Sequence, residues 1–333
     1  MKQYKPAYFD QFSCLAGDCP DSCCQLWEVA VDDKSADYYR SLPGQLGQDL
    51  RKALRQEDGL NLMTIVQGRC PMWQLDGLCR IQAQLGEQAL CQTCREFPRL
   101  THDYGDFIER GLELSCPEAA RLILSASPEP YSQEEVPGLG DAEYDAQDMA
   151  LLLATREQAR QLLANPAYPP QQRLAQLLLY GCQVQGALDG GELGAFSPED
   201  ALETALFSRK PGDIEAFVQT FRELEILTDA WREKLDSPAP GPWDSRTPAL
   251  ARYFVDRYWL QAVSDFDLYS RVKFICIACL LVKTLGGAFL RTAQLLSKEI
   301  ENDADNMDAL LDGAYTNPAF TDDKLLGMLL QEE

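Results

Sequence analysis

The sequence predicts a mainly α protein, in which an irregular cysteine-rich metal-binding N-terminal domain is followed by an all-α helical domain. Two observations support this prediction. Nine of the 12 cysteines lie within the first 116 residues, where only short stretches show a helical period. From about residue 141 onward, apolar residues recur three or four positions apart, which is typical of amphipathic helices. We therefore expect domains at residues 1–125 and 141–333, with a linker at 126–140.

The predicted N-terminal domain, residues 1–125, is rich in Cys, Gly, Pro and aromatic side chains. In such a domain, bonds to metal replace part of a hydrophobic core. The tract Lys34 to Leu54 looks helical but is interrupted at Pro43-Gly44. The tract Leu85 to Arg95 is expected to form a second short helix that ends before the next proline, because a residue before proline avoids the helical region. Residues 126–140 are rich in Pro, Gly and Glu and show no period, which is typical of a linker.

Helical periodicity predicts eight helices in the second domain. They span about residues 143–164, 170–188, 198–209, 213–235, 247–263, 267–285, 287–301 and 319–331. The helix at 213–235 has the clearest pattern, since its apolar residues form one stripe of the kind that faces a core. Ser197-Pro198 is a start signal and Gly286-Gly287 is a stop signal. Because no strand–helix alternation or internal repeat is visible, we expect a helical bundle or array.

The charge and hydropathy of the chain exclude some partners. Thirty Lys and Arg against 52 Asp and Glu give a formal net charge of −22, and this field repels nucleic-acid phosphates and anionic lipid. The first residues lack the apolar run and cleavage site of a secretory signal. The longest apolar run, 274–282, is less than half of the roughly 20 residues that span a bilayer. We therefore expect a cytoplasmic protein with no transmembrane segment and no nucleic-acid partner.

The cysteine cluster predicts a sulfur-ligated metal site. In a reducing compartment, clustered cysteines bind metal more often than they form disulfides. The segment 14–24 carries four thiols, at Cys14, Cys19, Cys23 and Cys24, and five more follow at Cys70, Cys79, Cys91, Cys94 and Cys116. This number exceeds the four thiolates that one zinc ion or one iron–sulfur cluster requires. The sequence therefore predicts either two centres, or one centre with further cysteines beside it.

Spacing alone leaves three interpretations of this site open: a structural zinc site, an iron–sulfur cluster, or a set of redox thiols. The adjacent pair Cys23-Cys24 and the lack of a βαβ context disfavour a thioredoxin-like motif. The sole histidine, His102, is interpreted as a surface or packing residue rather than a ligand. Cys276 and Cys279 lie in an apolar run, and we expect them and Cys182 to pack as small hydrophobic residues.

Several tracts of the N-terminal third carry a specific resemblance to a known family. They are Tyr8-Phe9 with Phe12-Ser13-Cys14, Cys19-Pro20-Asp21-Ser22-Cys23-Cys24-Gln25-Leu26-Trp27, Cys70-Pro71-Met72-Trp73, Asp76-Gly77-Leu78-Cys79-Arg80-Ile81-Gln82, Leu85-Gly86-Glu87, Cys94-Arg95-Glu96-Phe97-Pro98-Arg99 and Leu112-Glu113-Leu114-Ser115-Cys116-Pro117-Glu118-Ala119-Ala120. In order and spacing, these tracts resemble the bacterial flagellin lysine N-methylase family, whose cysteine-rich part is shared with a wider group of bacterial zinc- or iron-chelating domains. The helical remainder of the chain offers no comparable motif.

The resemblance implies transfer of methyl groups from S-adenosylmethionine to lysine side chains of flagellin, with a [4Fe–4S] cluster held by the cysteine-rich motif and zinc as the alternative metal. Carried over to this sequence, the ligands are Cys14, Cys19, Cys23, Cys24, Cys70, Cys79, Cys94 and Cys116, with Cys91 as a weaker candidate. No G-x-G-x-x-G segment follows a predicted strand, so the usual doubly wound cofactor domain is not expected. No C-x3-C-x2-C triplet is present either, and direct displacement and radical chemistry both remain open.

Three residues are candidates for binding S-adenosylmethionine. Trp27 can contact the methylsulfonium through a cation–π interaction, and Arg95 and Arg99 can bind its carboxylate. The alternative roles are packing for Trp27 and neutralisation of thiolates for the arginines. No catalytic residue is assigned. We expect a protein-lysine N-methyltransferase, and the alternative hypothesis is a non-catalytic cysteine-rich zinc- or iron-binding protein that acts in metal sensing or delivery.

Overall fold

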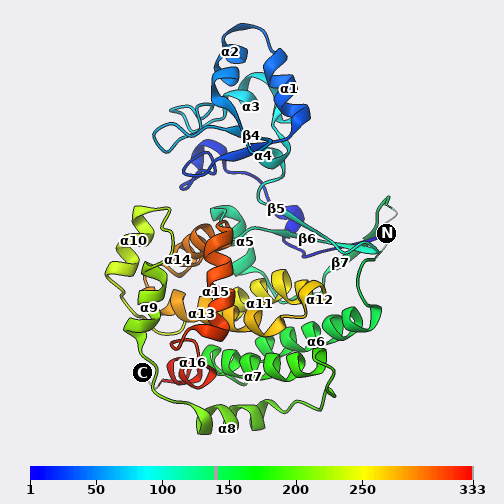
Figure 1. Cartoon of the computed structure of the whole chain (residues 1–333), viewed down its shortest axis with the longest axis vertical. Coiled ribbons are helices and arrows are strands. Elements are labelled where there is room, and N and C mark those ends of the chain that lie inside the picture. Colours follow the sequence, from blue (N-terminus) through cyan, green and yellow to red (C-terminus); the bar gives the residue numbers. More distant parts are fainter. Residues whose placement is uncertain (139–141, 332–333) are drawn as a thin grey trace.

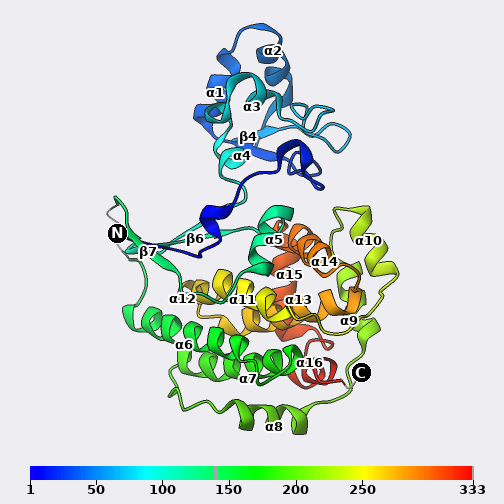
Figure 2. The ribbon, with the colours of Figure 1, turned by 180° about the vertical axis from the view of Figure 1, so that it is seen from behind.

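The computed structural model describes residues 1–138 and 142–331, and it is mainly helical with two small β-sheets. Figures 1 and 2 show a smaller lobe above a larger body that contains the C-terminal helices. Buried side chains form two clusters: one lies in the smaller lobe between residues 29 and 91, and the other lies in the larger body. The mainly α character is therefore confirmed, whereas the sequence pattern predicts neither sheet.

The smaller lobe contains a three-stranded antiparallel sheet in the order β2-β4-β3 (Val29–Val31, Leu60–Met63 and Leu54–Glu57). Asp58 and Gly59 form the turn between β3 and β4, and both have positive φ. Positive φ at both residues is a requirement of the commonest two-residue hairpin turns. The lobe also contains four short helices: α1 (Asp33–Ser41), α2 (Gly44–Ala53), α3 (Arg80–Leu85) and α4 (Gln92–Glu96).

The larger body begins with a four-stranded sheet in the order β5-β6-β1-β7 (Arg99–Asp103, Phe107–Leu112, Lys2–Lys5 and Ser132–Glu135). Strand β1 is parallel to β6 and antiparallel to β7. The N-terminal strand therefore lies between two segments from much later in the chain. Helix α5 (Pro117–Ser125) follows β6 and packs in the core of this body.

Helix α13 (Leu268–Leu285) lies in the core of the larger body, and 16 of its 18 residues are buried. Cys276 and Cys279 are among these buried residues, which confirms their predicted packing role. The other helices are α6 (Ala146–Ala164), α7 (Pro170–Leu188), α8 (Pro198–Ser208), α9 (Ile214–Arg222), α10 (Asp229–Asp236), α11 (Thr247–Tyr258), α12 (Ala262–Asp265), α14 (Phe289–Leu296), α15 (Ala304–Thr316) and α16 (Asp322–Leu329). Short 3-10 turns are η1 (Phe9–Gln11), η2 (Ala16–Asp18), η3 (Glu87–Ala89) and η4 (Trp259–Gln261), and a π turn, η5 (Ser297–Glu301), follows α14.

Most helices predicted for the second domain are confirmed, and the prediction at 170–188 coincides with α7. Ser197 caps α8, because its hydroxyl oxygen accepts a hydrogen bond from the Asp200 N–H. Gly286 ends α13 at a positive φ. The sequence pattern does not predict α15, and it places the start of α16 three residues too early.

The single helix predicted at 213–235 is wrong, since residues 223–228 separate α9 from α10. Side chains from elsewhere bond the backbone of this segment. Glu299 accepts a hydrogen bond from the Leu227 N–H at 2.7 Å, and Asn306 accepts one from the Glu225 N–H at 3.0 Å. These side chains take the place of the backbone acceptors that a continuous helix would supply. The spacing of apolar residues, on which the prediction rests, does not indicate such contacts.

The single helix predicted from Leu85 to Arg95 is also wrong, because Gly86 adopts a φ of 85° and ends α3 before η3 and α4. In the predicted linker, Ser132–Glu135 form β7, and residues 139–140 lie outside the described residues. The domain limits at 125 and 141 stay a prediction. No helix within 1–138 or 142–331 combines the length and the apolar character that a membrane span needs.

A buried ion pair joins the four-stranded sheet to the helices. Arg156 on α6 donates hydrogen bonds of 2.7 and 2.6 Å to the two carboxylate oxygens of Glu109 on β6. Both residues are only 4% exposed. A bidentate contact of this kind fixes orientation as well as distance. Removal of either partner leaves the other charge buried without compensation.

We predict that Arg156→Met lowers the free energy of unfolding by about 3–5 kcal/mol, the usual cost of breaking a buried pair. Urea unfolding followed by circular dichroism measures this loss. Arg232→Met is the matched control, because Arg232 lies on an exposed position of a helix, and it should change the free energy by about 0.5 kcal/mol or less. Equal losses in the two variants would contradict a special role for the ion pair.

Candidate metal centre

Close backbone packing holds the loop that carries Cys14 and Cys19. A Cβ atom at Gly17 would lie 2.8 Å from the Asp76 carbonyl oxygen, and one at Gly77 would lie 2.8 Å from Gly17 Cα. Real Cβ atoms do not approach other atoms so closely, so glycine is required on both sides of this contact. The loop is therefore held against the turn at Asp76-Gly77.

Backbone contacts bring together cysteines from separate segments of the smaller lobe. The Cys70 N–H donates to the Cys24 carbonyl oxygen at 2.9 Å, and Cys79 pairs with Trp73 in an isolated β-bridge. Cys79 directly precedes α3, Cys91 directly precedes α4, and Cys94 lies within α4.

The charges that act on each thiol show which of the nine N-terminal cysteines lie near one another, and they indicate two groups that meet at Cys23 and Cys24. Burial raises the pKa of Cys116 to about 11, and negative charge at Cys19 and Cys14 contributes. Burial raises the pKa of Cys70 to about 12, with contributions from Cys24, Cys79 and Cys91. Such effects act between close neighbours. We define the first thiol group as Cys14, Cys19, Cys23 and Cys116, and the second thiol group as Cys24, Cys70, Cys79, Cys91 and Cys94.

Two pairs of neighbouring thiols affect each other's titration. The Cys23 thiol lowers the pKa of Cys24 to about 7, and Cys24 in turn raises the pKa of Cys23. Cys94 likewise lowers the pKa of Cys91, and Cys91 raises that of Cys94. Metal ligation requires the thiolate form, and one sulfur of each pair is favoured as a thiolate.

The donor set fits a sulfur-ligated centre by residue type, because thiolates bind both zinc and iron–sulfur clusters. Each thiol group contains at least four cysteines. Over residues 1–138 and 142–331, however, no three His, Cys, Asp or Glu side chains converge as a ready-made metal site. The structure therefore brings the eight predicted ligands and Cys91 into two adjoining groups without a closed coordination shell, and their role as ligands stays a prediction.

A buried carboxylate, which the sequence analysis does not identify, attaches residues 14–24, here called the cysteine loop, to the helices of the larger body. Asp21 lies between Cys19 and Cys23 and is 8% exposed. It accepts hydrogen bonds from Lys298 Nζ at 2.7 Å, Arg291 Nη1 at 2.7 Å and Gln294 Nε2 at 3.0 Å. Burial alone would raise the pKa of Asp21, but the bonds from Lys298 and Arg291 outweigh burial and hold this pKa below its ordinary value.

Gln294 on α14 links the two halves of the first thiol group. Its side-chain amide donates to the Asp21 carboxylate at 3.0 Å and to the Ser115 carbonyl oxygen at 2.6 Å. Ser115 directly precedes Cys116, which in turn precedes α5. One side chain therefore positions the Cys19–Cys23 segment relative to Cys116. The two partners of Gln294 lie 273 and 179 residues earlier in the chain, and sequence spacing offers no signal for such contacts.

The three residues predicted to bind the cofactor have different neighbours. The Trp27 ring packs against Phe97, with 6.2 Å between ring centroids, and Lys298 Nζ lies 5.0 Å from its centroid. Trp27 thus already contacts a buried cation. The Arg99 guanidinium carbon lies 5.1 Å from the Phe12 ring centroid, and Arg95 is half-buried on α4. Their roles toward a cofactor stay predictions.

His102 lies on β5 and is half-buried. Burial lowers the pKa of His102, and the positive charge of Arg257 lowers it further. This environment favours a neutral imidazole packed against the helical body.

Comparisons with known proteins connect this chain to flagellar proteins and lysine methylases. The chain is 34% identical over 128 residues to a flagellar biosynthetic protein FliU of Salmonella muenchen, and the match covers 36% of this chain and 76% of that protein. Over 128 residues it is also 34% identical to lysine-N-methylases of Salmonella typhimurium and Salmonella choleraesuis. The match spans about a third of these two relatives, 32% of each. No family model and no solved structure matches the chain.

We predict that Asp21→Asn lowers the free energy of unfolding by about 3 kcal/mol or more at neutral pH, because Lys298 keeps a buried charge without its counter-charge. Denaturant unfolding of both proteins measures the loss. Asp18→Asn is the matched control, since Asp18 is exposed in the same loop, and it should change the free energy by about 0.5 kcal/mol or less.

The loss caused by Asp21→Asn should also depend on pH. Because the folded pKa of Asp21 lies below its ordinary value, the stabilisation is complete above the unfolded pKa of about 3.9 and disappears as pH falls through the folded pKa. The difference in free energy of unfolding between the parent and Asp21→Asn should therefore be constant from about pH 5 to pH 8 and should shrink below about pH 4. A difference that grows on acidification would have the wrong sign for this contact.

Proposed function

Because the chain belongs to the flagellin lysine N-methylase family, we propose that it is a protein-lysine N-methyltransferase that acts on flagellin. The observation that carries this proposal is the 34% identity over 128 residues to two proteins named lysine-N-methylase. The similarity to FliU, of which the match covers 76%, supports the flagellar context.

The two thiol groups are proposed to hold the sulfur-ligated metal, as a [4Fe–4S] cluster with zinc as the alternative. Each group supplies the four thiols that one zinc ion or one cluster needs. The first thiol group is assembled from the cysteine loop and the start of α5, which Gln294 holds together. Metal binding and the docking of this loop should therefore be coupled, as metal binding and folding are in other cysteine-rich domains.

The proposed reaction sets requirements for the substrate lysine. S-adenosylmethionine supplies the methyl group when it is bound. A lysine side chain accepts a methyl group as a neutral amine, and its ordinary pKa is about 10.4. The enzyme must therefore lower this pKa by desolvation or accept the proton with a base. The net charge of −22 attracts exposed ammonium groups of the substrate at long range.

We predict that the chain, purified without oxygen, contains iron and acid-labile sulfide, because both thiol groups offer enough ligands for a cluster. Elemental analysis, a sulfide assay and the visible spectrum measure this content. Cys23→Ser should lower both metal content and stability. Cys276→Ala is the control that keeps the metal, since Cys276 is fully buried in α13. Stoichiometric zinc without acid-labile sulfide would contradict the cluster and indicate a zinc site instead.

We predict that flagellin from cells with the protein carries lysines heavier by one or more methylene masses than flagellin from cells without it. Mass spectrometry of both flagellins, with a Cys23→Ser strain as the third sample, tests this. In a purified reaction the rate should fall as salt rises, because the screening length decreases from about 10 Å at 0.1 M to about 3 Å at 1 M. Identical lysine methylation in all three strains would favour a non-catalytic metal-binding protein.

A further inference from the structure

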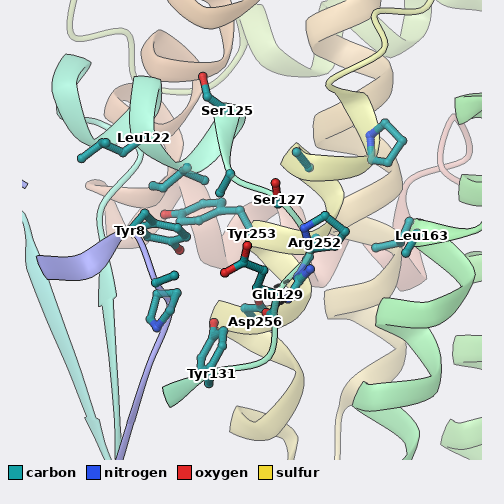
Figure 3. A pocket seen from close by; sticks show the side chains of 18 of the residues that line it. Tyr8, Leu122, Ser125, Ser127, Glu129, Tyr131, Leu163, Arg252, Tyr253 and Asp256 are labelled. Atoms are coloured by element: carbon teal, nitrogen blue, oxygen red, sulfur yellow. Dashed lines mark hydrogen bonds and ion pairs between the residues drawn. The ribbon is translucent and has the colours of Figure 1, made fainter. Parts of the chain in front are cut away.

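A cavity of about 430 Å³ lies in the larger body, where the end of α5 faces α11 and the segment after β1 (Figure 3). This volume is within the range of about 300–1,000 Å³ that is usual for small-molecule sites. Tyr8, Tyr131 and Tyr253 contribute aromatic rings to it from three separate segments. None of the nine N-terminal cysteines lines the cavity in the part of the chain that the structure describes.

Part of the charge on the cavity wall is already paired, because Arg121 donates two hydrogen bonds to Glu118 and Arg252 lies beside Asp256. Three arginines, Arg121, Arg173 and Arg252, line the cavity together with the carboxylates of Glu129 and Asp256. Arg173 donates only to backbone carbonyl oxygens among its described partners, so no carboxylate neutralises it. With Arg173 and the Glu129 carboxylate in its wall, the site favours a ligand that carries both an anionic and a cationic group.

Asp256 and the Glu129 backbone fix the orientation of Arg252. Arg252 Nε lies 3.6 Å from Asp256 Oδ2, and Arg252 Nη2 donates to the Glu129 carbonyl oxygen at 2.9 Å. Arg160 holds the other oxygen of Asp256, with Nε donating to Oδ1 at 2.6 Å. Arg252 Nη1 has no hydrogen-bond partner among residues 1–138 and 142–331. Its N–H groups are therefore available to a carboxylate, with which arginine forms strong charge-assisted bonds.

Tyr8 and Tyr131 offer flat apolar surfaces beside these charges. Both rings are half-buried, and no hydrogen bond to either hydroxyl group occurs among the described residues. The Arg160 guanidinium carbon lies 4.7 Å from the Tyr131 ring centroid, so Arg160 already packs on that ring. Tyr8 is the better platform for a flat heterocycle, which stacks well on aromatic side chains.

Tyr253 connects the cavity to the first thiol group. Its hydroxyl oxygen accepts hydrogen bonds from the Leu114 N–H at 3.3 Å and from Arg257 Nη1 at 2.9 Å, and its hydroxyl donates to Glu301 at 3.1 Å. Leu114 is two residues before Cys116. Helix α5 then runs from Cys116 toward the cavity, and Arg121 lies about 7.5 Å further along its axis. The cavity and the first thiol group therefore lie at opposite ends of one short helix.

We infer that this cavity binds S-adenosylmethionine, with Arg252 holding its carboxylate, Glu129 its ammonium group and Tyr8 its adenine ring. This inference rests on the proposed function. The ligand is an amino acid joined through a sulfonium cation to a flat base, and the wall offers a partner for the carboxylate, for the ammonium group and for the base. Trp27, Arg95 and Arg99 do not line the cavity, so the cofactor is assigned to residues that differ from those predicted by sequence.

Binding of S-adenosylmethionine and of its product, S-adenosylhomocysteine, to the metal-loaded full chain tests the inference by calorimetry without oxygen. Tyr8→Leu and Arg252→Gln should each weaken binding about tenfold or more, a loss of about 1.4 kcal/mol, because one removes the stacking surface for the base and the other a charged hydrogen bond. Tyr8→Phe keeps the ring and should bind within about threefold of the parent. Tyr38→Leu and Arg232→Gln, both at exposed positions, are the matched controls.

Hydrogen exchange of the unmodified chain gives a second measurement that needs no variant. Added S-adenosylhomocysteine should slow exchange in the segments 6–8 and 121–131, most of whose residues line the cavity. Parent-like binding in the folded Tyr8→Leu and Arg252→Gln variants, or no slowing in these segments, would overturn the cavity assignment while the methyltransferase proposal stands. Failure of the metal-loaded parent to bind either compound would overturn the proposed cofactor, and the cavity assignment with it.

Discussion

The position of the cysteine loop depends on the burial of one carboxylate. A charge removed from water is costly unless cations and hydrogen-bond donors compensate for it. Asp21 obtains this compensation from Arg291, Gln294 and Lys298, which all belong to α14 and η5. The loop can occupy its position only when this helical segment is in place. Assembly of the first thiol group is therefore a property of the whole chain rather than of its N-terminal third.

The π turn η5 extends this dependence to the rest of the body. Lys298 donates a hydrogen bond to Asp21, and Glu299 accepts one from the backbone between α9 and α10. Glu301 accepts a hydrogen bond from Tyr253 in the cavity wall. π turns recur at functional sites because they redirect side chains within a helix. Five residues thus support the cysteine loop, a break between two helices and one wall of the cavity. A disturbance at η5 should reach all three.

Sequence patterns predict what depends on local hydrogen bonds and residue type. Helix α7 is predicted correctly because its apolar period and its backbone bonds both lie within the element. Strand β1 is missed because it pairs with β6, more than 100 residues away. The cysteines are identified by their chemistry alone, whereas a single aspartate such as Asp21 looks the same in a sequence whether it is solvated or buried. The grouping of the thiols depends on distances between segments, which spacing along the chain does not contain.

The contact between Asp21 and Lys298 also sets an order of events during synthesis, because it spans 277 residues. A ribosome that adds about 5–20 residues per second needs roughly 15–55 s to make the intervening chain. All nine N-terminal cysteines have therefore left the ribosome long before α14 and η5, which hold the cysteine loop, are made. During this interval the nascent thiols are open to metal donors and to oxidants alike. The supply of metal during synthesis therefore acts on thiols that α14 and η5 do not yet hold in place.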